Sequence, residues 1–209
     1  MLRLCQPTGS NRQRLCRAAI SKGRWSVLNT YVALLRGINV GGRNKIAMKD
    51  LHASFVALGH GEVTTYIQSG NVVFRSASKL ASKLGPAIEA EISKTFGLKI
   101  GVLVRTPSDF DILIKDDPYL APGRETSKTM VMFLEDAPST DAIAGLDPQR
   151  SPPDEFVVRG REIYLYCPNG FGRSKLSIDY FERRLRTRAT ARNWKTVVKL
   201  ADLMAAAGR

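Results

Sequence analysis

The sequence predicts an α+β protein built from two consecutive modules, the first of which has the βαββαβ order of the ferredoxin-like fold. Short apolar runs rich in β-branched residues alternate with segments whose apolar residues recur at helical spacing. The same order begins again after a stretch rich in proline and glycine. With 209 residues, of which 44% are hydrophobic and 24% charged, the chain has the composition of a globular protein of one or two domains.

The first module is predicted over residues 30–116. Residues 31–40 form an apolar run that ends in glycines, which is typical of a strand. A helix follows over residues 48–58, where apolar side chains share one face and Gly59 ends the pattern. The next elements are predicted as strands over residues 62–68 and 71–75 joined by a tight turn at Ser69-Gly70, a helix over residues 80–96 with Pro86 in or near its first turns, a strand over residues 99–105 and a short helix over residues 108–114.

A linker is predicted at residues 117–127, where Pro118, Pro122 and Gly123 cluster. The second module is predicted over residues 128–209, with βαββα order and a C-terminal helix. Because this order repeats most of the first module, we expect a structural duplication without evident sequence identity. The predicted elements are a strand over residues 128–135, a helix over residues 140–146 after a Ser139 cap, a hairpin of residues 156–159 and 162–167 about Gly160, a helix over residues 177–188 and a last helix over residues 195–207 capped by Asn193.

The formal net charge of +13 is distributed unevenly. Residues 1–29 hold six basic residues and no acidic residue, without apolar periodicity, so we expect a disordered tail that the fold does not need. Its Arg and Ser content resembles that of an organellar transit peptide, but a start codon placed too far upstream would give the same composition, and we favour the second explanation. Most of the remaining excess lies in residues 171–195, which hold eight basic and two acidic residues.

Two glycine-rich, polar segments are predicted to meet at one end of the first sheet. In the βαββαβ order the first two strands are parallel, so the loop after the first strand and the turn after the second lie at the same end. The loop leads into a helix N-terminus, where an anion is favoured, so we expect a phosphorylated small molecule or a nucleotide to bind there. The same glycines and asparagines could instead only shape the turns. The candidate ligand-binding residues are Arg36, Gly37, Asn39, Gly41, Gly42 and Arg43 in the loop and Gln68, Ser69, Gly70 and Asn71 in the turn.

The basic segment of residues 171–195 suggests an alternative function, the binding of RNA or another polyanion. Residues 169–175 are glycine-rich and basic, but their order does not match the GxxxxGK[ST] pattern of a Walker loop. Arg192, Asn193 and Trp194 could stack on and bond a base or sugar, or they could cap and anchor the last helix, and we favour the second interpretation. The candidate residues of this second basic site are Arg173, Ser174, Lys175, Arg192, Asn193 and Trp194.

The sequence gives little indication of catalysis. Its two histidines and three cysteines match no metal site, disulfide framework or nucleophilic triad, so we name no catalytic or metal-binding residue. The cofactor and the oligomeric state stay unknown, and the sequence leaves open whether the protein is an enzyme or a structural protein without a ligand. The apolar runs are too short to span a bilayer, so we expect no membrane partner. The three cysteines are few and scattered, which favours a reducing compartment, so we expect a cytoplasmic protein.

Long motifs carry a resemblance to a known family. The segments YVALLRGINVGG, beginning at Tyr31, and TYIQSGNVVF, ending at Phe74, resemble the signature of a large family of uncharacterised, mainly bacterial proteins, a domain of unknown function. The resemblance continues through residues 103–106, 166–175 and 191–200, so it covers about residues 30–206. It implies an α+β fold with a ferredoxin-like part, and it implies no established activity, cofactor or catalytic residue. Residues 1–29 depart from the family pattern, which usually begins close to the first strand.

Overall fold

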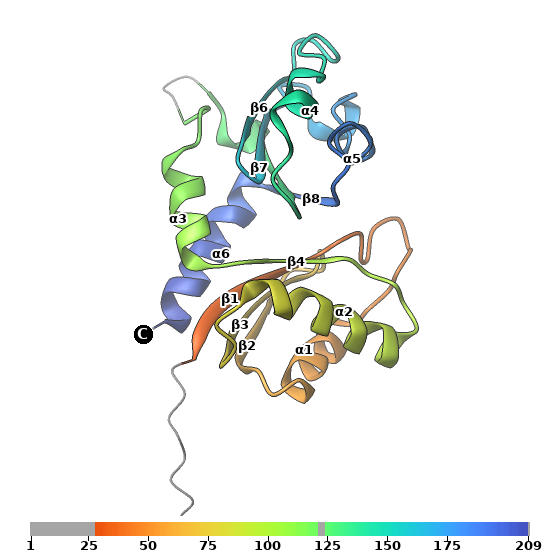
Figure 1. Ribbon diagram of the computed structural model, residues 1–209, viewed down its shortest axis with the longest axis vertical. Helices are drawn as coiled ribbons and strands as arrows, with labels where there is room; N and C mark the ends of the chain where they lie inside the picture. The colour runs from red at the N-terminus through yellow and green to blue at the C-terminus, as the bar shows by residue number, and fades with distance from the viewer. Residues whose placement is uncertain (1–27, 121–123, 209) are drawn as a thin grey trace, which may run out of the picture.

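A computed structural model describes residues 28–120 and 124–208 of the chain (Figure 1). The predicted tail of residues 1–29 lies outside the described residues except for its last two positions. Part of the predicted linker, residues 121–123, also lies outside them. The first strand begins at Asn29, one residue before the predicted start of the first module.

The first four-stranded sheet has the antiparallel order β2-β3-β1-β4. Strand β3 pairs antiparallel with both β1 and β2, so β1 and β2 are parallel as predicted. Helices α1 and α2 cover one face of this sheet (Figure 1). The elements are β1 (Asn29–Leu35), α1 (Met48–Ala57), β2 (Gly61–Tyr66), β3 (Asn71–Ser76), α2 (Ala81–Phe96) and β4 (Val102–Arg105). The predicted ferredoxin-like order is therefore confirmed.

The second sheet repeats this topology with the order β6-β7-β5-β8. Its last strand, β8, was not identified in the sequence, and it pairs with β5 from Met130↔Asn193 to Leu134↔Ala189. The predicted helix over residues 177–188 ends earlier, because Arg186 adopts a left-handed conformation with φ 55°. The elements are η1 (Thr126–Lys128), β5 (Thr129–Leu134), α4 (Thr140–Ala144), β6 (Glu155–Arg159), β7 (Glu162–Tyr166), η2 (Phe171–Arg173), α5 (Ile178–Leu185) and β8 (Ala189–Asn193). The α+β class with a repeated module is confirmed, and β8 completes a second βαββαβ order.

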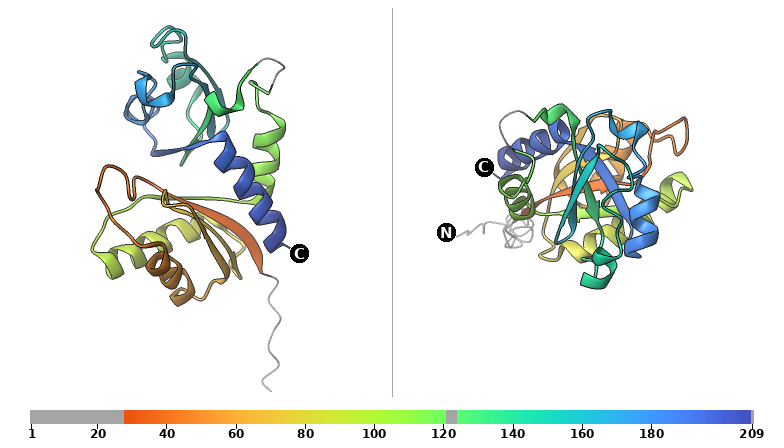
Figure 2. Two further views of the ribbon diagram at one scale, coloured as in Figure 1. Left: turned by 180° about the vertical axis from the view of Figure 1, so that it is seen from behind. Right: turned by 90° about the horizontal axis from the view of Figure 1, so that it is seen from above.

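Two further helices join the sheets. Helix α3 (Pro107–Lys115) follows β4, and α6 (Trp194–Ala207) follows β8. The two helices lie side by side along one flank, and α6 runs from the second sheet along the first (Figure 2). They contribute to an apolar cluster that also contains residues of both sheets. The C-terminal helix therefore belongs to the packing of both halves.

Side chains of β1 alternate between two apolar clusters. Tyr31 and Leu35 pack with α1 and α2, whereas Val32 and Leu34 pack in the cluster shared with the second sheet. Both faces of the central strand are buried, which explains why its sequence reads as a continuous apolar run rather than as an alternation. A third cluster lies between the second sheet and helices α4 and α5.

Candidate functional site

The glycine-rich loop and the hairpin turn meet at one end of the first sheet, as the topology predicts. Asn39 joins them: its Nδ2 donates to the carbonyls of Ile46 (3.0 Å) and Gln68 (2.9 Å), and its Oδ1 accepts from the Ile46 N–H (2.9 Å). Asn44 Nδ2 donates to the Gly37 carbonyl at 3.1 Å. Asn39, a predicted ligand-binding residue, and Asn44 thus hold the loop in shape, which leaves ligand contacts to backbone groups and to cationic side chains.

A hollow of about 490 Å³ opens between the two segments. Its size is within the range of small-molecule sites. Its walls combine apolar side chains, the Asn39 and Gln68 side chains and one lysine, Lys45. The lining residues are Asn39, Gly42, Lys45, Ile46, Ala47, Met48 and Gln68. No acidic residue belongs to this described lining, so the hollow favours an anion over a cation.

The N-terminus of α1 opens into this hollow without a side-chain cap. Ala47 occupies the N-cap position in an extended conformation (φ −68°, ψ 138°), and its methyl group accepts no hydrogen bond. In contrast to α1, four helices begin with a capping side chain: Thr106 for α3, Ser139 for α4, Ser177 for α5 and Asn193 for α6. The first N–H groups of α1 therefore stay available to an acceptor from solution.

Helix α2 provides a useful comparison, because it also begins without a side-chain cap, after Leu80. The hollow at its N-terminus, of about 350 Å³, is lined by two acidic residues, Glu135 and Asp136, and by two arginines, Arg105 and Arg161. The lining at α1 holds Lys45 and no acidic residue, although Asp50 lies in the first turn of that helix. The charged side chains of the lining are therefore balanced at α2 and net positive at α1.

The cationic side chains of the loop are arranged differently from one another. Arg36 does not line the hollow and forms a two-point ion pair with Glu182, through Nε (3.0 Å) and Nη2 (2.6 Å). Arg43 and Lys45 are exposed, and neither forms an ion pair with a described residue. Of these three cationic side chains, Lys45 lines the hollow, Arg43 forms no ion pair with a described residue and Arg36 joins the two halves of the chain.

Glycines in this region have two separate roles. Gly37, Gly41 and Gly42 have positive φ angles, and a Cβ atom at any of them would meet no heavy atom within 4 Å. Gly70 also has a positive φ (75°), but a Cβ there would lie 2.7 Å from Leu35 Cβ and 2.8 Å from Ile38. Gly70 is thus required by close packing beneath the turn as well as by its backbone conformation, whereas the loop glycines are required by conformation alone.

A buried arginine of the second module lies directly behind the hairpin turn. The Arg192 guanidinium donates from Nε to Asn71 Oδ1 (2.5 Å) and from Nη2 to the carbonyls of Leu35 (2.9 Å), Ser69 (3.1 Å) and Gly70 (3.3 Å). Its Nη1 donates to Thr190 Oγ1 and to the Ala191 carbonyl, both at 2.8 Å. Burial lowers the pKa of Arg192 to about 10, which leaves it charged at neutral pH. The two candidate sites of the sequence are therefore joined through one side chain.

The trio that begins at Arg192 does not form a stacking surface. Asn193 caps α6, its Oδ1 accepting from the Thr196 N–H at 2.8 Å. Trp194 is 6% exposed and packs in the cluster between the sheets. The favoured interpretation of these residues, a helix cap and a core anchor, is confirmed, and the three side chains face three different surroundings.

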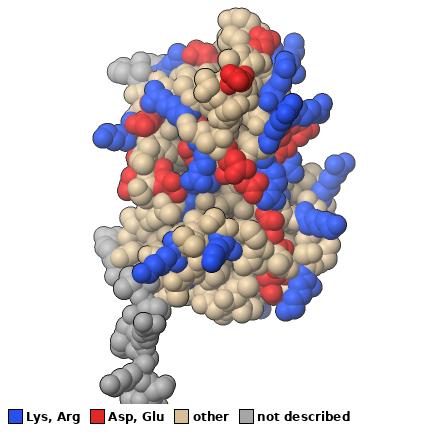
Figure 3. Space-filling view, viewed as in Figure 1, with Lys and Arg blue, Asp and Glu red and all other residues tan. Residues whose placement is uncertain are grey.

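The rest of the second basic site lies on the surface. Arg173 and Lys175 are exposed in and after η2, and Ser174 Oγ accepts from the Leu176 N–H at 3.0 Å. Lys and Arg side chains gather on the side of the molecule where α5 lies, whereas positive and negative side chains alternate where the two halves meet (Figure 3). The excess charge of residues 171–195 is thus partly an exposed feature and partly internal.

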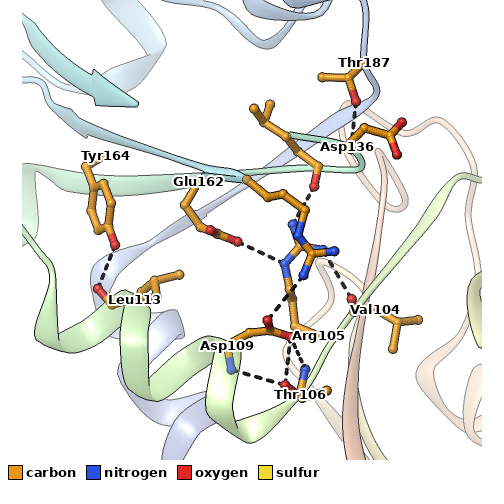
Figure 4. Close-up of polar contacts among 11 residues, drawn as sticks. Val104, Arg105, Thr106, Asp109, Leu113, Asp136, Glu162, Tyr164 and Thr187 are labelled. Carbon is orange, nitrogen blue, oxygen red and sulfur yellow. Dashed lines mark hydrogen bonds and ion pairs between the residues drawn. The ribbon is translucent and has the colours of Figure 1, made fainter. Parts of the chain in front are cut away.

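A polar seam that the sequence did not indicate joins the two modules around Arg105 (Figure 4). Arg105 is 1% exposed, and it donates to Glu162 Oε1 (3.0 Å) and to the Leu134 carbonyl (2.5 Å). Beside it, Arg161 pairs with Asp109 at 3.3 Å. Desolvation lowers the pKa of Arg105, and the charge of Glu162 opposes this shift. The only sequence signal was an arginine at the end of an apolar strand, which does not reveal its partner 57 positions away.

The described residues offer little for acid–base or metal chemistry. They contain no cluster of three or more His, Cys, Asp or Glu side chains that could hold a metal ion. Burial raises the pKa of the Cys167 thiol to about 11, so this cysteine is an unreactive core residue. Burial lowers the pKa of His60, whose ring lies 4.7 Å from that of Phe74. No helix among the described residues is long and apolar enough to cross a membrane.

Comparisons with known proteins relate the chain to a family and to a solved structure. Residues 28–164 match the family model described as "Protein of unknown function (DUF1697)". Among solved structures, the conserved bacterial protein SP0830 from Streptococcus pneumoniae is similar at 22% sequence identity and a TM-score of 0.66, over 85% of this chain and 99% of that one. At this identity the similarity shows the fold alone. No curated protein matches the chain.

Proposed function

The chain belongs to the DUF1697 family of proteins of unknown function, and we propose that it binds a small phosphorylated ligand, such as a nucleotide or a sugar phosphate, in the hollow at the N-terminus of α1. The observation that carries the proposal is the uncapped start of this ten-residue helix inside a hollow whose charged lining residue is Lys45. A phosphate at this position would accept hydrogen bonds from the first N–H groups of α1 and pair with the Lys45 ammonium.

The rest of the hollow suits the remainder of such a ligand. Ile46 and Met48 offer apolar contacts, and Gln68 offers an amide that can donate and accept hydrogen bonds. Asn39 holds the two walls together through three hydrogen bonds and so fixes the distance between them. A site that is already formed without its ligand loses little conformational entropy on binding.

The proposal concerns binding rather than catalysis. The residues that line the hollow include no histidine, cysteine or carboxylate, so the lining itself supplies no general base or nucleophile. A binding protein for a phosphorylated metabolite also fits the cytoplasmic location that we expect from the sequence.

The direct test is an NMR titration of the labelled full chain with inorganic phosphate, pyrophosphate, mononucleotides and sugar phosphates. We expect saturable shifts at the amides of Met48 and Lys49, and weaker binding in Lys45→Ala. Lys99→Ala is the matched control, because Lys99 is exposed and lies outside this hollow. The proposal is wrong if no compound shifts these amides, or if Lys45→Ala and Lys99→Ala weaken binding equally.

A further inference from the structure

Three arginines converge on a second hollow, on the surface of the second module. Arg150, from the loop before β6, and Arg183 and Arg184, from α5, line a space of about 420 Å³ together with Ser177, Asp179 and Tyr180. Asp179 is the one carboxylate of this described lining. Three guanidinium groups around one carboxylate leave the hollow with a net positive charge.

One of these arginines is held in position. The Arg150 guanidinium lies 4.1 Å from the centre of the Tyr180 ring, and its Nε donates to the Lys175 carbonyl at 3.1 Å. Tyr180 is itself fixed, since it is 8% exposed and its hydroxyl accepts from the Asp147 N–H at 2.9 Å. These contacts order the guanidinium before any ligand arrives. Its two Nη groups form no hydrogen bond with a described residue, so they stay available to a ligand.

The acidic side chains near this group are too few to neutralise it, since Asp179 is the one carboxylate of the lining. Glu182, the acidic residue of α5 nearest to the arginine pair in sequence, is bonded to Arg36 and to the Ala189 N–H. Among the described ion pairs, none involves Arg150, Arg183 or Arg184. By contrast, Arg188 of the same basic segment pairs with Glu89 and Glu135. The basic segment therefore divides into arginines held by other protein groups, such as Arg188 and Arg192, and exposed ones, of which Arg183 and Arg184 line this hollow.

The arrangement identifies a chemical class of ligand. A guanidinium group binds a phosphate oxygen pair through two parallel hydrogen bonds, which makes an arginine cluster a phosphate site. Further exposed cations flank the hollow in the chain, Arg173 and Lys175 before α5 and Arg186 after it. Arg150 covers the Tyr180 ring, so the lining presents no free aromatic face on which a base could stack.

We infer that this arginine cluster of Arg150, Arg183 and Arg184 binds the phosphodiester backbone of nucleic acid without reading its sequence. Lys175 lies beside the cluster, since its carbonyl accepts from Arg150 Nε, and Arg186 ends α5 two residues after Arg184. Cations beyond the three arginines of the lining suit a chain of phosphates better than one small anion. The inference is independent of the proposed ligand at α1, because the two hollows share no lining residue.

The test measures binding of a short fluorescein-labelled oligothymidylate to the full chain by anisotropy, between about 50 and 200 mM salt. Arg183→Ala and Arg184→Ala should each weaken binding and flatten the slope of log K against log salt by about 0.7, the value for one phosphate contact on a single strand. The matched control is Lys199→Ala, which removes one exposed charge of α6. Any contribution of residues 1–27 to oligonucleotide binding is the same in the parent and in all variants, so it cancels in the comparison.

Three outcomes would overturn the inference. Equal effects of Arg183→Ala and Lys199→Ala would show that only the net charge matters. An unchanged slope of log K against log salt in both arginine variants would show that neither arginine contacts a phosphate. Pyrophosphate binding that depends on Arg183, with oligonucleotide binding that does not, would assign the hollow to a small anion. Lys45→Ala separates this site from the one at α1, since we expect it to affect oligonucleotide binding no more than Lys199→Ala does.

Discussion

Replacing Arg192 by leucine tests how the two modules are joined. Arg192 is 6% exposed, and its guanidinium forms six hydrogen bonds, four of them to the end of β1 and to the hairpin turn of the first module. Without it, the carbonyls of Leu35 and Ser69 and the Asn71 amide oxygen lose a donor in the first module. Thr190 Oγ1 and the Ala191 carbonyl lose one in β8. The Gly70 carbonyl keeps one, because it also accepts from the Leu35 N–H at 2.8 Å.

The expected loss follows from these orphaned acceptors. Each buried acceptor without a partner costs about 1–3 kcal/mol, and three of them exceed what is regained by no longer burying a charge. We expect Arg192→Leu to lower the free energy of unfolding by about 3–5 kcal/mol, which for a chain of this size lowers the melting temperature by roughly 10 °C. Arg192→Lys should lose less, because it keeps the charge but reaches fewer acceptors.

Urea denaturation and calorimetry of the full chain provide the measurement. Arg184→Leu is the control, since Arg184 is exposed and forms no hydrogen bond with a described residue, and it should unfold like the parent. Amide hydrogen exchange should show the loss at the hairpin turn of residues 67–70. An Arg192→Leu protein within about 1 kcal/mol of the parent would refute the reasoning, because the buried guanidinium would then contribute nothing net to the junction.

Three further predictions concern single positions. Gly70→Ala should destabilise the protein by about 3 kcal/mol, because the residue has a positive φ and the new Cβ would clash with Leu35 Cβ. Gly41→Ala should cost about 1 kcal/mol, because φ is positive but the space around it is open. Equal urea midpoints of the two variants would contradict the difference. Gly85→Ala should lower the melting temperature, because its Cβ would lie 2.9 Å from the Val102 carbonyl oxygen, and an unchanged melting curve would show that α2 can move off β4. Burial lowers the pKa of His60 below its ordinary value of 6.5, so its neutral form contributes stability that is present above pH 6.5 and is lost as the pH falls through the lowered pKa. Between pH 7.5 and 5, the free energy of unfolding of His60→Phe should therefore fall less than that of the parent. Parallel curves of unfolding free energy against pH would refute this role of His60.

Periodicity and turn chemistry predicted most of the elements. The apolar spacing of α1, the Ser69-Gly70 turn and the caps at Ser139 and Asn193 all act locally, so they are visible in the sequence. Strand β8 was missed because its five residues, Ala189–Asn193, carry little apolar signal and gain their structure by pairing with β5.

The sequence predicted where the candidate sites lie but not which side chains come together in them. Strand topology placed the loop and the turn at one end of the sheet, yet it did not reveal that Arg36 pairs with Glu182, 146 positions away. Arg150 joins the α5 arginines from a different loop, and Arg192 lies behind the turn. These relations depend on how the modules pack, and nothing within a few residues of any of these side chains encodes them.

The most direct test of the proposed function is the variant Ala47→Asp, measured for both stability and phosphate binding. Ala47 has the extended conformation of an N-cap residue, so an aspartate carboxylate there should accept from the first turn of α1 and stabilise the protein by about 1 kcal/mol. The same carboxylate occupies the anion position and repels phosphate. We expect this variant to unfold at higher urea than the parent and to show no phosphate-dependent shift at the Met48 and Lys49 amides. A stabilised variant that binds phosphate as tightly as the parent would contradict it.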